Sequence, residues 1–400
     1  MKKLILLMML LLALVGVAQA APQENRTVLG IERIDEAKRL LEGRRVGLFT
    51  NQTGVDSQLK SSVDILKEKY NLAAVYVPEH GLFGAVAAGE KFEDENYEGI
   101  PIISLYGATR RPTQEMLDRI DVMCVDIQDI GARHYTYFSS LAYIMEECAK
   151  RKMQVVVFDR PNPLGGTIQG PVLKPEFKTF IGLYEIPLRH GLTIGEYAKY
   201  INTKYNIRCF LKVVPMQNYR RNMVWKDTGL PWVMTSPLIP TEDTAWYYLL
   251  TGVIGDTNIS NGVGTSKPFY FIGAPFINSQ EFKAELEKLP FEGVKYRRAA
   301  YKPRYGSYKD EIVHGVEVYL EQPEKINLPE LQYSIMYLLK QKYPEMTFPD
   351  RGFDADGTRS DIGLGEDSIR KGEAPEKVFP RWQQECGQYA EDIKPFLLYK

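Results

Sequence analysis

Short apolar runs alternate with longer segments of helical periodicity between residues 44 and 214. The runs, rich in β-branched and aliphatic residues, predict strands at residues 46–50, 72–77, 102–105, 122–127, 155–158 and 210–214. The longer segments predict helices at residues 56–68, 113–119, 136–152 and 193–205. Such alternation is typical of βαβ units, so the sequence predicts a Rossmann-like α/β domain built on a parallel sheet.

The pattern changes after residue 250, where Gly, Asn, Thr and Pro dominate the segment TGVIGDTNISNGVGTSKPF. A strand at residues 313–320 and a helix at residues 328–341 then follow without the earlier alternation. We therefore expect a Rossmann-like domain over residues 21–252, a smaller α+β auxiliary domain over residues 253–400, and the active-site cleft between them.

Residues 1–20 have the pattern of a signal peptide, with Lys2 and Lys3 before an apolar stretch and a small-residue Ala-Gln-Ala ending. Cleavage is expected near Ala20, and the mature protein is expected to be exported, either periplasmic or secreted. No later run reaches the roughly 18 apolar residues that a membrane-spanning helix needs, so no transmembrane anchor is predicted in the mature chain.

The balance of charges argues against nucleic acid as a partner, because 50 basic and 51 acidic residues give a formal net charge of -1. No GxGxxG follows the first strand, and Glu90 stands where the lysine of a phosphate loop belongs in GAVAAGEK. We expect no cofactor and no metal site. A metal-dependent hydrolase stays an alternative, because His80 and His134 lie near predicted strand ends.

Polar residues follow the ends of the predicted parallel strands, where ligands bind in open sheets of this kind. These residues are Asn51, Glu79, His80, Tyr106, Gln128, Asp129, Asp159 and Arg160, with Asp126 near the end of its own strand. Glu79, in VPEHGLFG, follows an apolar run, and desolvation there would raise its pKa toward that of a general acid. The alternative is a glutamate that caps a turn or pairs with an arginine.

Two later motifs are rich in groups that can orient a sugar. VDIQDIGARHYTYFS adds Arg133, His134 and Tyr137 to the acids before them, although these residues could also form a capping and salt-bridge network. IPLRHGLTIGE places Arg189 and His190 before a helix N-terminus, where an anionic group such as a substrate carboxylate can bind. Asp159 and Arg160, in FDRPNPLGG, could bind the substrate or could form an ion pair that is purely structural.

VPEHGLFG, AGEK, GIPIISLYG, VDIQDIGARHYTY, FDRPNPLGG, PLRHGLTIGE and GAPF, in this order, resemble the exo-acting β-N-acetylmuramidases of the NamZ family, formerly a domain of unknown function. The resemblance covers nearly the whole mature chain. It implies a glycoside hydrolase of cell-wall recycling that releases N-acetylmuramic acid from the non-reducing end of peptidoglycan-derived glycans. It also implies that the catalytic glutamate of the PEHG motif is Glu79.

The chain departs from this family in two segments, SPLIP and GDTNISNGVGT. Where the family has SPN-x-P and EGTN-x-SEGRGT, Leu238 replaces an asparagine, Gly255 and Asn261 replace glutamates, and Val263 replaces an arginine. We expect these changes to relax, shift or abolish the preference for muramic acid.

A glycosidase needs a second group besides its general acid, either a carboxylate or the substrate's own N-acetyl oxygen. Asp126, Asp129 and Asp159 are the candidates in the protein. The lactyl carboxylate and sugar hydroxyls are expected to contact Arg133, His134, Arg189 and His190, and sugar rings to stack on Tyr106 and Tyr137. The expected partner is a muramyl disaccharide or a larger peptidoglycan-derived glycan. The alternatives are a non-catalytic protein that binds cell-wall fragments and a metal-dependent envelope hydrolase.

Overall fold

A seven-stranded sheet organises the first half of the chain in this computed structural model, which describes residues 26–87, 89–90, 94–350 and 357–400. The signal peptide predicted for residues 1–20 lies outside the described residues. The strand order is β3-β4-β2-β1-β5-β6-β9, and every neighbouring pair is parallel except β3 with β4. The strands are β1 (Arg45–Thr50), β2 (Asn71–Val77), β3 (Glu95–Tyr97), β4 (Ile100–Ser104), β5 (Val122–Asp126), β6 (Gln154–Phe158) and β9 (Phe210–Val214). All six predicted strands are confirmed, and β3 is an additional edge strand.

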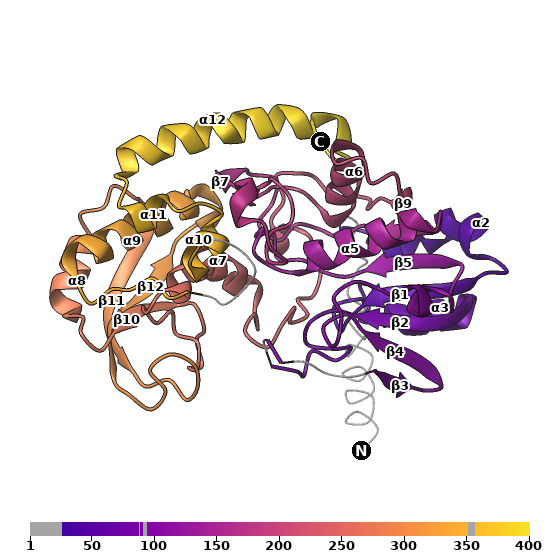
Figure 1. Cartoon of the computed structure of the whole chain (residues 1–400), viewed down its shortest axis with the longest axis horizontal. Coiled ribbons are helices and arrows are strands. Elements are labelled where there is room, and N and C mark those ends of the chain that lie inside the picture. Colours follow the sequence, from indigo (N-terminus) through magenta and orange to yellow (C-terminus); the bar gives the residue numbers. More distant parts are fainter. Residues whose placement is uncertain (1–25, 88, 91–93, 351–356) are drawn as a thin grey trace, which may run out of the picture.

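Helices cover both faces of this sheet (Figure 1). They are α2 (Lys38–Leu41), α3 (Ser62–Lys69), α4 (Gln114–Leu117), α5 (Tyr137–Lys150) and α6 (Ile194–Lys204), with the 3-10 helix η1 (Gly30–Ala37) before them. The helix predicted from residue 56 begins at Ser62 instead. Asp56 accepts hydrogen bonds from the backbone of Gln58 and Lys60, which closes a turn, and Ser61 then caps the helix at Val63.

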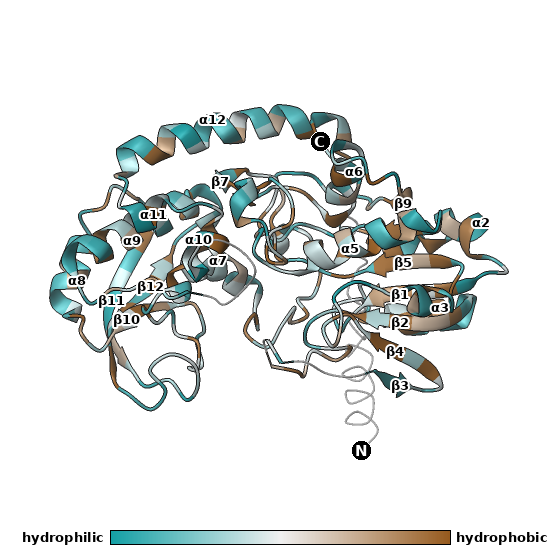
Figure 2. Ribbon diagram, in the orientation of Figure 1, coloured by the Kyte–Doolittle hydropathy of each residue, from teal (hydrophilic) through white to brown (hydrophobic). Residues whose placement is uncertain are grey.

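Two apolar layers lie on opposite faces of the sheet. Val122 and Cys124 of β5 pack in one layer, and Met123 and Val125 pack in the other. All these side chains are fully buried, as expected for a parallel strand covered on both faces. Figure 2 shows β4 and β5 largely in brown, whereas most of the long helix α12 is teal.

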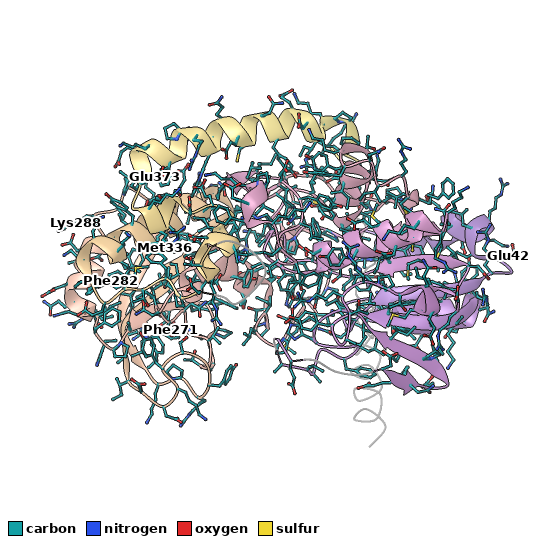
Figure 3. All side chains as sticks on the ribbon, viewed as in Figure 1. Glu42, Phe271, Phe282, Lys288, Met336 and Glu373 are labelled. Carbon is teal, nitrogen blue, oxygen red and sulfur yellow. The ribbon has the colours of Figure 1, made fainter. Side chains whose placement is uncertain are left out.

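The C-terminal part is built on a smaller antiparallel sheet of order β10-β12-β11. Its elements are β10 (Phe271–Ala274), β11 (Val294–Tyr301), β12 (Val313–Leu320), α7 (Glu242–Thr251), α8 (Ser279–Leu286), α9 (Leu328–Lys342), α10 (Arg359–Leu364) and α11 (Ser368–Lys371). Phe282 of α8 and Met336 of α9 are fully buried, and Lys288 lies at the outer edge (Figure 3). The predicted strand at residues 313–320 is confirmed as β12, and α9 extends the predicted helix by one residue. The fold is therefore α/β with a smaller C-terminal part, as predicted.

The connection between the two parts runs through α7, which packs against α9. The side chain of Gln332 donates hydrogen bonds to the carbonyl oxygens of Leu249 and Leu250 at 2.8 and 2.9 Å. The domain boundary near residue 252 stays a prediction. A two-stranded hairpin, β7 (Gln169–Val172) with β8 (Pro187–Arg189), lies beside α9 and α12.

Helix α12 (Pro375–Ile393) lies across both parts and returns the chain to the first one (Figure 1). The Tyr399 hydroxyl donates to Asp159 Oδ2 at 2.6 Å and accepts from the Met216 amide at 2.9 Å. The Leu398 amide donates to Glu196 at 2.9 Å, and Arg221 donates to the carbonyl oxygen of Lys400 at 3.0 Å. The last residues of the chain thus complete the hydrogen bonds of the N-terminal part. Within the part of the chain that the structure describes, no helix has the length and apolarity to cross a bilayer.

Replacing Tyr399 by phenylalanine is expected to lower the free energy of unfolding by about 1–3 kcal/mol, because Asp159, which is fully buried, loses a hydrogen-bond donor. Thermal unfolding of the variant and the wild type at one pH measures the loss. Tyr305→Phe is the matched control, since Tyr305 is 51% exposed. Equal midpoints for the two variants would contradict this prediction.

Candidate active site

Glu79 follows β2 at the carboxyl edge of the sheet and is half-buried. Its Oε1 accepts a hydrogen bond from the Gly89 amide at 2.7 Å, and its Oε2 accepts one from the Thr136 hydroxyl at 3.3 Å. The loop after it turns sharply at His80 and Gly81, which have φ values of 75° and 73°. The loop therefore folds back so that the Gly89 amide reaches the carboxylate, and Thr136, just before α5, donates to it from outside the loop.

His80 belongs to this loop as a structural residue. It is 6% exposed, and its Nδ1 lies 2.7 Å from the carbonyl oxygen of Val86, to which it donates. This contact fixes the tautomer, with the proton on Nδ1. His80 thus helps to close the loop that positions Glu79.

Tyr106 and Arg110 lie beside Glu79 on the loop that follows β4 (Ile100–Ser104). The Tyr106 hydroxyl lies near Glu79 and Arg110, and burial together with the Glu79 charge raises the pKa of Tyr106. The Arg110 guanidinium lies 5.1 Å from the centre of the Tyr106 ring and 4.4 Å from that of Phe180. Arg110 and Phe180 are absent from the set predicted from the sequence, because no motif marks them.

Asp126 lies at the end of β5 in a bidentate ion pair with Arg160. The two hydrogen bonds measure 2.7 and 2.8 Å, and the side chains are 0% and 3% exposed. Arg160 also donates to the carbonyl oxygen of Val55 at 2.6 Å. A carboxylate bound on both oxygens and closed to solvent has the geometry of a structural ion pair.

Asp159 is likewise enclosed, because Thr193, Gly195 and Tyr399 all donate to its two oxygens at 2.6 to 2.8 Å. Burial raises its pKa to about 7. Neither Asp126 nor Asp159 therefore faces an open site. The catalytic role of Asp126 and the substrate-binding roles of Asp159 and Arg160 stay predictions, and the enclosed geometry of these side chains does not favour them.

Asp129 differs from Asp126 and Asp159 because one of its carboxylate oxygens accepts no hydrogen bond from the described residues. Its Oδ1 accepts from the Gly131 amide at 2.7 Å, but its Oδ2 has no hydrogen-bond partner among the described residues. Burial raises the pKa of Asp129 to about 7, and the side chain is 6% exposed. His190 Nε2, also without a hydrogen-bond partner among them, lies 4.0 Å from Asp129 Oδ1.

Asn51, Gln128 and Tyr137 are buried and bind groups inside the protein. Asn51 donates to the Tyr137 hydroxyl at 2.8 Å, and that hydroxyl donates to the carbonyl oxygen of Thr235 at 2.5 Å. Gln128 donates to the carbonyl oxygen of Pro161 at 2.7 Å. Since Tyr137 is 1% exposed, its ring is packed inside the protein and offers no stacking surface to a sugar.

Arg133, Arg189 and His190 are buried and bind backbone groups rather than facing the Glu79 loop. Arg133 donates to four carbonyl oxygens, those of Pro171, Ile186, Gly363 and Leu364. Arg189 donates to Gln169 at 2.9 Å and to the carbonyl oxygen of Leu164 at 2.5 Å. Burial lowers the pKa of His190 to about 3, so this side chain is neutral. The hydrogen bonds of Arg133 join the hairpin of β7 and β8 to the C-terminal part.

A cavity of about 280 Å³ lies at the junction of the two parts. His134, stacked on Tyr248 with ring centres 4.5 Å apart, belongs to its wall. The four positions that depart from the family pattern, Leu238, Gly255, Asn261 and Val263, all line this cavity. Glu79 is not among the described residues that line this cavity, so the active-site cleft between the two parts stays a prediction.

Comparisons with known proteins agree with this architecture. Models of the N-terminal and C-terminal regions of the exo-β-N-acetylmuramidase NamZ match residues 46–243 and 246–399. The peptidoglycan β-N-acetylmuramidase NamZ of Bacillus subtilis (strain 168) is 40% identical over 375 residues, which are 92% of this chain and 89% of that protein.

Two solved structures of DUF1343 family proteins from Bacteroides fragilis NCTC 9343 also resemble the chain. One has a TM-score of 0.84 and 37% identity, covering 94% of this chain and 100% of the other. The second has a TM-score of 0.74 and 27% identity, covering 94% and 99%. The first family model covers the sheet and the Glu79 loop, the second covers the C-terminal part, and the Bacillus subtilis relative matches 92% of the chain; the chain therefore belongs to the exo-β-N-acetylmuramidase NamZ family.

Proposed function

We propose that this protein is an exo-acting glycoside hydrolase that releases N-acetylmuramic acid from the non-reducing end of peptidoglycan fragments. The observation that carries the proposal is the half-buried Glu79 carboxylate, held by Gly89 and Thr136 at the carboxyl edge of the sheet. Family membership supports the reaction, because the Bacillus subtilis relative is named a peptidoglycan β-N-acetylmuramidase.

Glu79 acts as the general acid in this proposal and protonates the leaving glycosidic oxygen. Its oxygens each accept one backbone or side-chain hydrogen bond from Gly89 and Thr136, and a carboxyl group has further lone pairs to bind a proton. Tyr106, which contacts Glu79, fixes its orientation. Arg110 and Phe180 form the adjacent wall, where the cation and the ring can contact the sugar.

The substrate's own N-acetyl oxygen is the second catalytic group in this proposal. The reason is that Asp126 and Asp159 are bound on both oxygens inside the protein, and Asp129 is enclosed. In glycosidases of this kind the N-acetyl oxygen attacks the anomeric carbon in place of a carboxylate. A disaccharide with a 2-hydroxyl in place of the N-acetyl group is then expected to be bound but not cleaved.

Asp129→Asn is expected to retain sugar release within about tenfold, because Asp129 has no part in bond cleavage here. The variant should also gain stability relative to the wild type as the pH rises. The pKa of Asp129 is raised from 3.8 to about 7 in the folded protein. The contribution of Asp129 to stability is therefore fully present below pH 3.8 and is lost as the pH rises through about 7, whereas asparagine stays neutral throughout. Thermal unfolding at pH 4 and pH 8, together with a sugar-release assay, measures both effects. A loss of release comparable to that of a Glu79 variant would assign Asp129 the second function instead.

Incubating the mature protein with a muramic-acid-terminated disaccharide, with free sugar as the readout, tests the proposal against its alternatives. Saturable binding without sugar release identifies a non-catalytic cell-wall-binding protein. Release that is lost with a chelator and recovered with added metal identifies a metal-dependent hydrolase. We further propose export to the periplasm or the medium, and N-terminal sequencing of the mature protein should begin at Ala21.

A further inference from the structure

The hydroxyl of Thr136 is turned away from the helix that this residue begins. Thr136 directly precedes α5 (Tyr137–Lys150), and a threonine in that place usually accepts a hydrogen bond from the first turn of its helix. Here the hydroxyl makes no such bond within α5, because the Thr136 backbone is helical, with φ of -79° and ψ of -7°, rather than extended. It donates to Glu79 Oε2 at 3.3 Å instead.

The start of α5 is held in place on both sides of Thr136. The carbonyl oxygen of Thr136 accepts from the Ser140 amide at 3.0 Å. The next residue, Tyr137, is 1% exposed, and its hydroxyl accepts from Asn51 at 2.8 Å and donates to the carbonyl oxygen of Thr235 at 2.5 Å. A donor fixed in this way needs little reorganisation when charge appears on its acceptor.

The two hydrogen bonds to Glu79 differ in length. Oε1 accepts from the Gly89 amide at 2.7 Å, whereas Oε2 accepts from the Thr136 hydroxyl at 3.3 Å. In a neutral carboxyl group the oxygen without the proton is the better acceptor, so the short bond marks Oε1 as that oxygen and assigns the proton to Oε2. A bond between a hydroxyl and an oxygen is most often about 2.7–2.8 Å long, so the Thr136 bond has room to shorten.

Proton transfer changes the charge of Oε2. In the proposed reaction the Oε2–H bond breaks, and its proton bonds to the glycosidic oxygen, which keeps both electrons of its bond to the anomeric carbon. The electron pair of the O–H bond stays on Oε2, so Glu79 becomes a carboxylate. A hydroxyl binds a carboxylate oxygen more strongly than a neutral one. The Thr136 bond therefore strengthens as the transition state forms, which lowers the barrier.

We propose that the Thr136 hydroxyl stabilises the negative charge that develops on Glu79 Oε2 as the proton leaves. This inference rests on the proposed function. Thr136 is then a positioning residue that acts through Glu79. The amino end of α5 adds to the effect, because its partial positive charge favours a nearby anion.

Thr136→Val and Thr136→Ser separate the hydroxyl from the size of the side chain. Valine has the shape of threonine without the donor, and serine keeps the donor. We expect Thr136→Val to lower kcat for a muramyl disaccharide by about 10- to 100-fold with little change in KM, because the bond strengthens only in the transition state. Thr136→Ser should stay within about threefold of the wild type. Equal rates for Thr136→Val and the wild type, or for the two variants, would overturn the inference.

The leaving group distinguishes stabilisation of charge from damage to the site. Proton transfer contributes little to cleavage of a nitrophenyl muramide, because its leaving oxygen is already weakly basic. Thr136→Val should therefore reduce cleavage of this substrate much less than cleavage of the disaccharide. Equal losses on the two substrates would overturn the inference.

Asn278→Ala is the control for helix stability, since Asn278 does cap its helix. Its side chain accepts from the Gln280 and Glu281 amides of α8 at 3.0 and 3.2 Å. This variant should have a lower thermal midpoint and unchanged sugar release. Thr136→Val loses no cap and should keep a midpoint closer to that of the wild type. A fall as large as that of Asn278→Ala would assign the role of Thr136 to the helix and overturn the inference.

NMR titration of carbon-13-labelled Glu79 separates failure of this inference from failure of the proposed function. Its carboxyl signal is the one missing from Glu79→Gln. Among the described residues, the titratable and charged side chains around Glu79 are the same in the proteins compared: His80, Glu90, Tyr106, Arg110 and Tyr137.

Glu79 should lose its proton at a higher pH in Thr136→Val than in the wild type and in Thr136→Ser, because the carboxylate has lost a donor. Such a change without sugar release by the wild type would uphold the effect of Thr136 on the charge of Glu79 and refute the hydrolase. Sugar release with the same titration in all three proteins would do the reverse.

Discussion

Glu79→Gln is expected to lower kcat/KM for a muramyl disaccharide by about 10³-fold, because glutamine has no proton to give to the leaving oxygen. The fold should be retained. The amide oxygen can still accept from the Gly89 amide, and the Thr136 hydroxyl can turn to accept from the amide nitrogen. Sugar release measured beside circular dichroism checks both expectations.

The leaving group provides a sharper readout for general acid catalysis. A nitrophenyl muramide needs little protonation of its leaving oxygen, so Glu79→Gln should reduce its cleavage far less than that of the disaccharide. Glu90→Gln is the matched control, since Glu90 is exposed on the same loop and undergoes the same substitution. Equal losses on both substrates would indicate that Glu79 only shapes the loop, and wild-type release by Glu79→Gln would refute its catalytic role.

Arg160→Met is expected to cause the largest loss of stability among the substitutions considered, about 3–5 kcal/mol of the free energy of unfolding. It leaves the Asp126 carboxylate, which is 0% exposed, without its bidentate partner. The urea midpoint of unfolding measures the loss. A second change, Asp126→Leu, should restore part of it, because no buried charge then remains.

Lys204→Met is the matched control for this experiment. Lys204 forms an ion pair with Asp392 at 2.7 Å, but the two side chains are 46% and 30% exposed. Solvent screens such a pair, and its removal should change the urea midpoint little. Similar losses of stability in the Arg160→Met and Lys204→Met variants would show that burial does not make the Asp126–Arg160 ion pair more important for stability.

The sheet was predictable because its parallel strands are covered on both faces. β5, for example, is buried at every position, and its first four residues, 122–125, form an uninterrupted apolar run in the sequence. β3 is a three-residue edge strand, Glu95–Tyr97, with no buried side chain, so no apolar pattern marks it. The hairpin of β7 and β8 is too short and too rich in glycine and proline to resemble a strand pair.

The candidate site was predictable only in part. The position of Glu79 and Tyr106 after neighbouring strands follows from the parallel topology, because these strand ends share one edge. The direction in which an arginine side chain points does not follow from it. Arg133 and Arg189 have the donors that a carboxylate needs, but the same donors bind backbone carbonyl oxygens in the interior. Arg110 has no motif of its own, and its place beside Glu79 depends on how the loop after β4 folds.

The return of the C-terminus to the N-terminal part has a consequence for biosynthesis. Asp159 is made early, but Tyr399, which donates to it, follows 240 residues later along the chain. A nascent chain that still lacks its end can form the sheet but cannot complete the hydrogen bonds around this buried carboxylate. The N-terminal part therefore reaches its full stability only after Tyr399 has been translated, and a truncated polypeptide that stops before α12 is expected to be more sensitive to proteases.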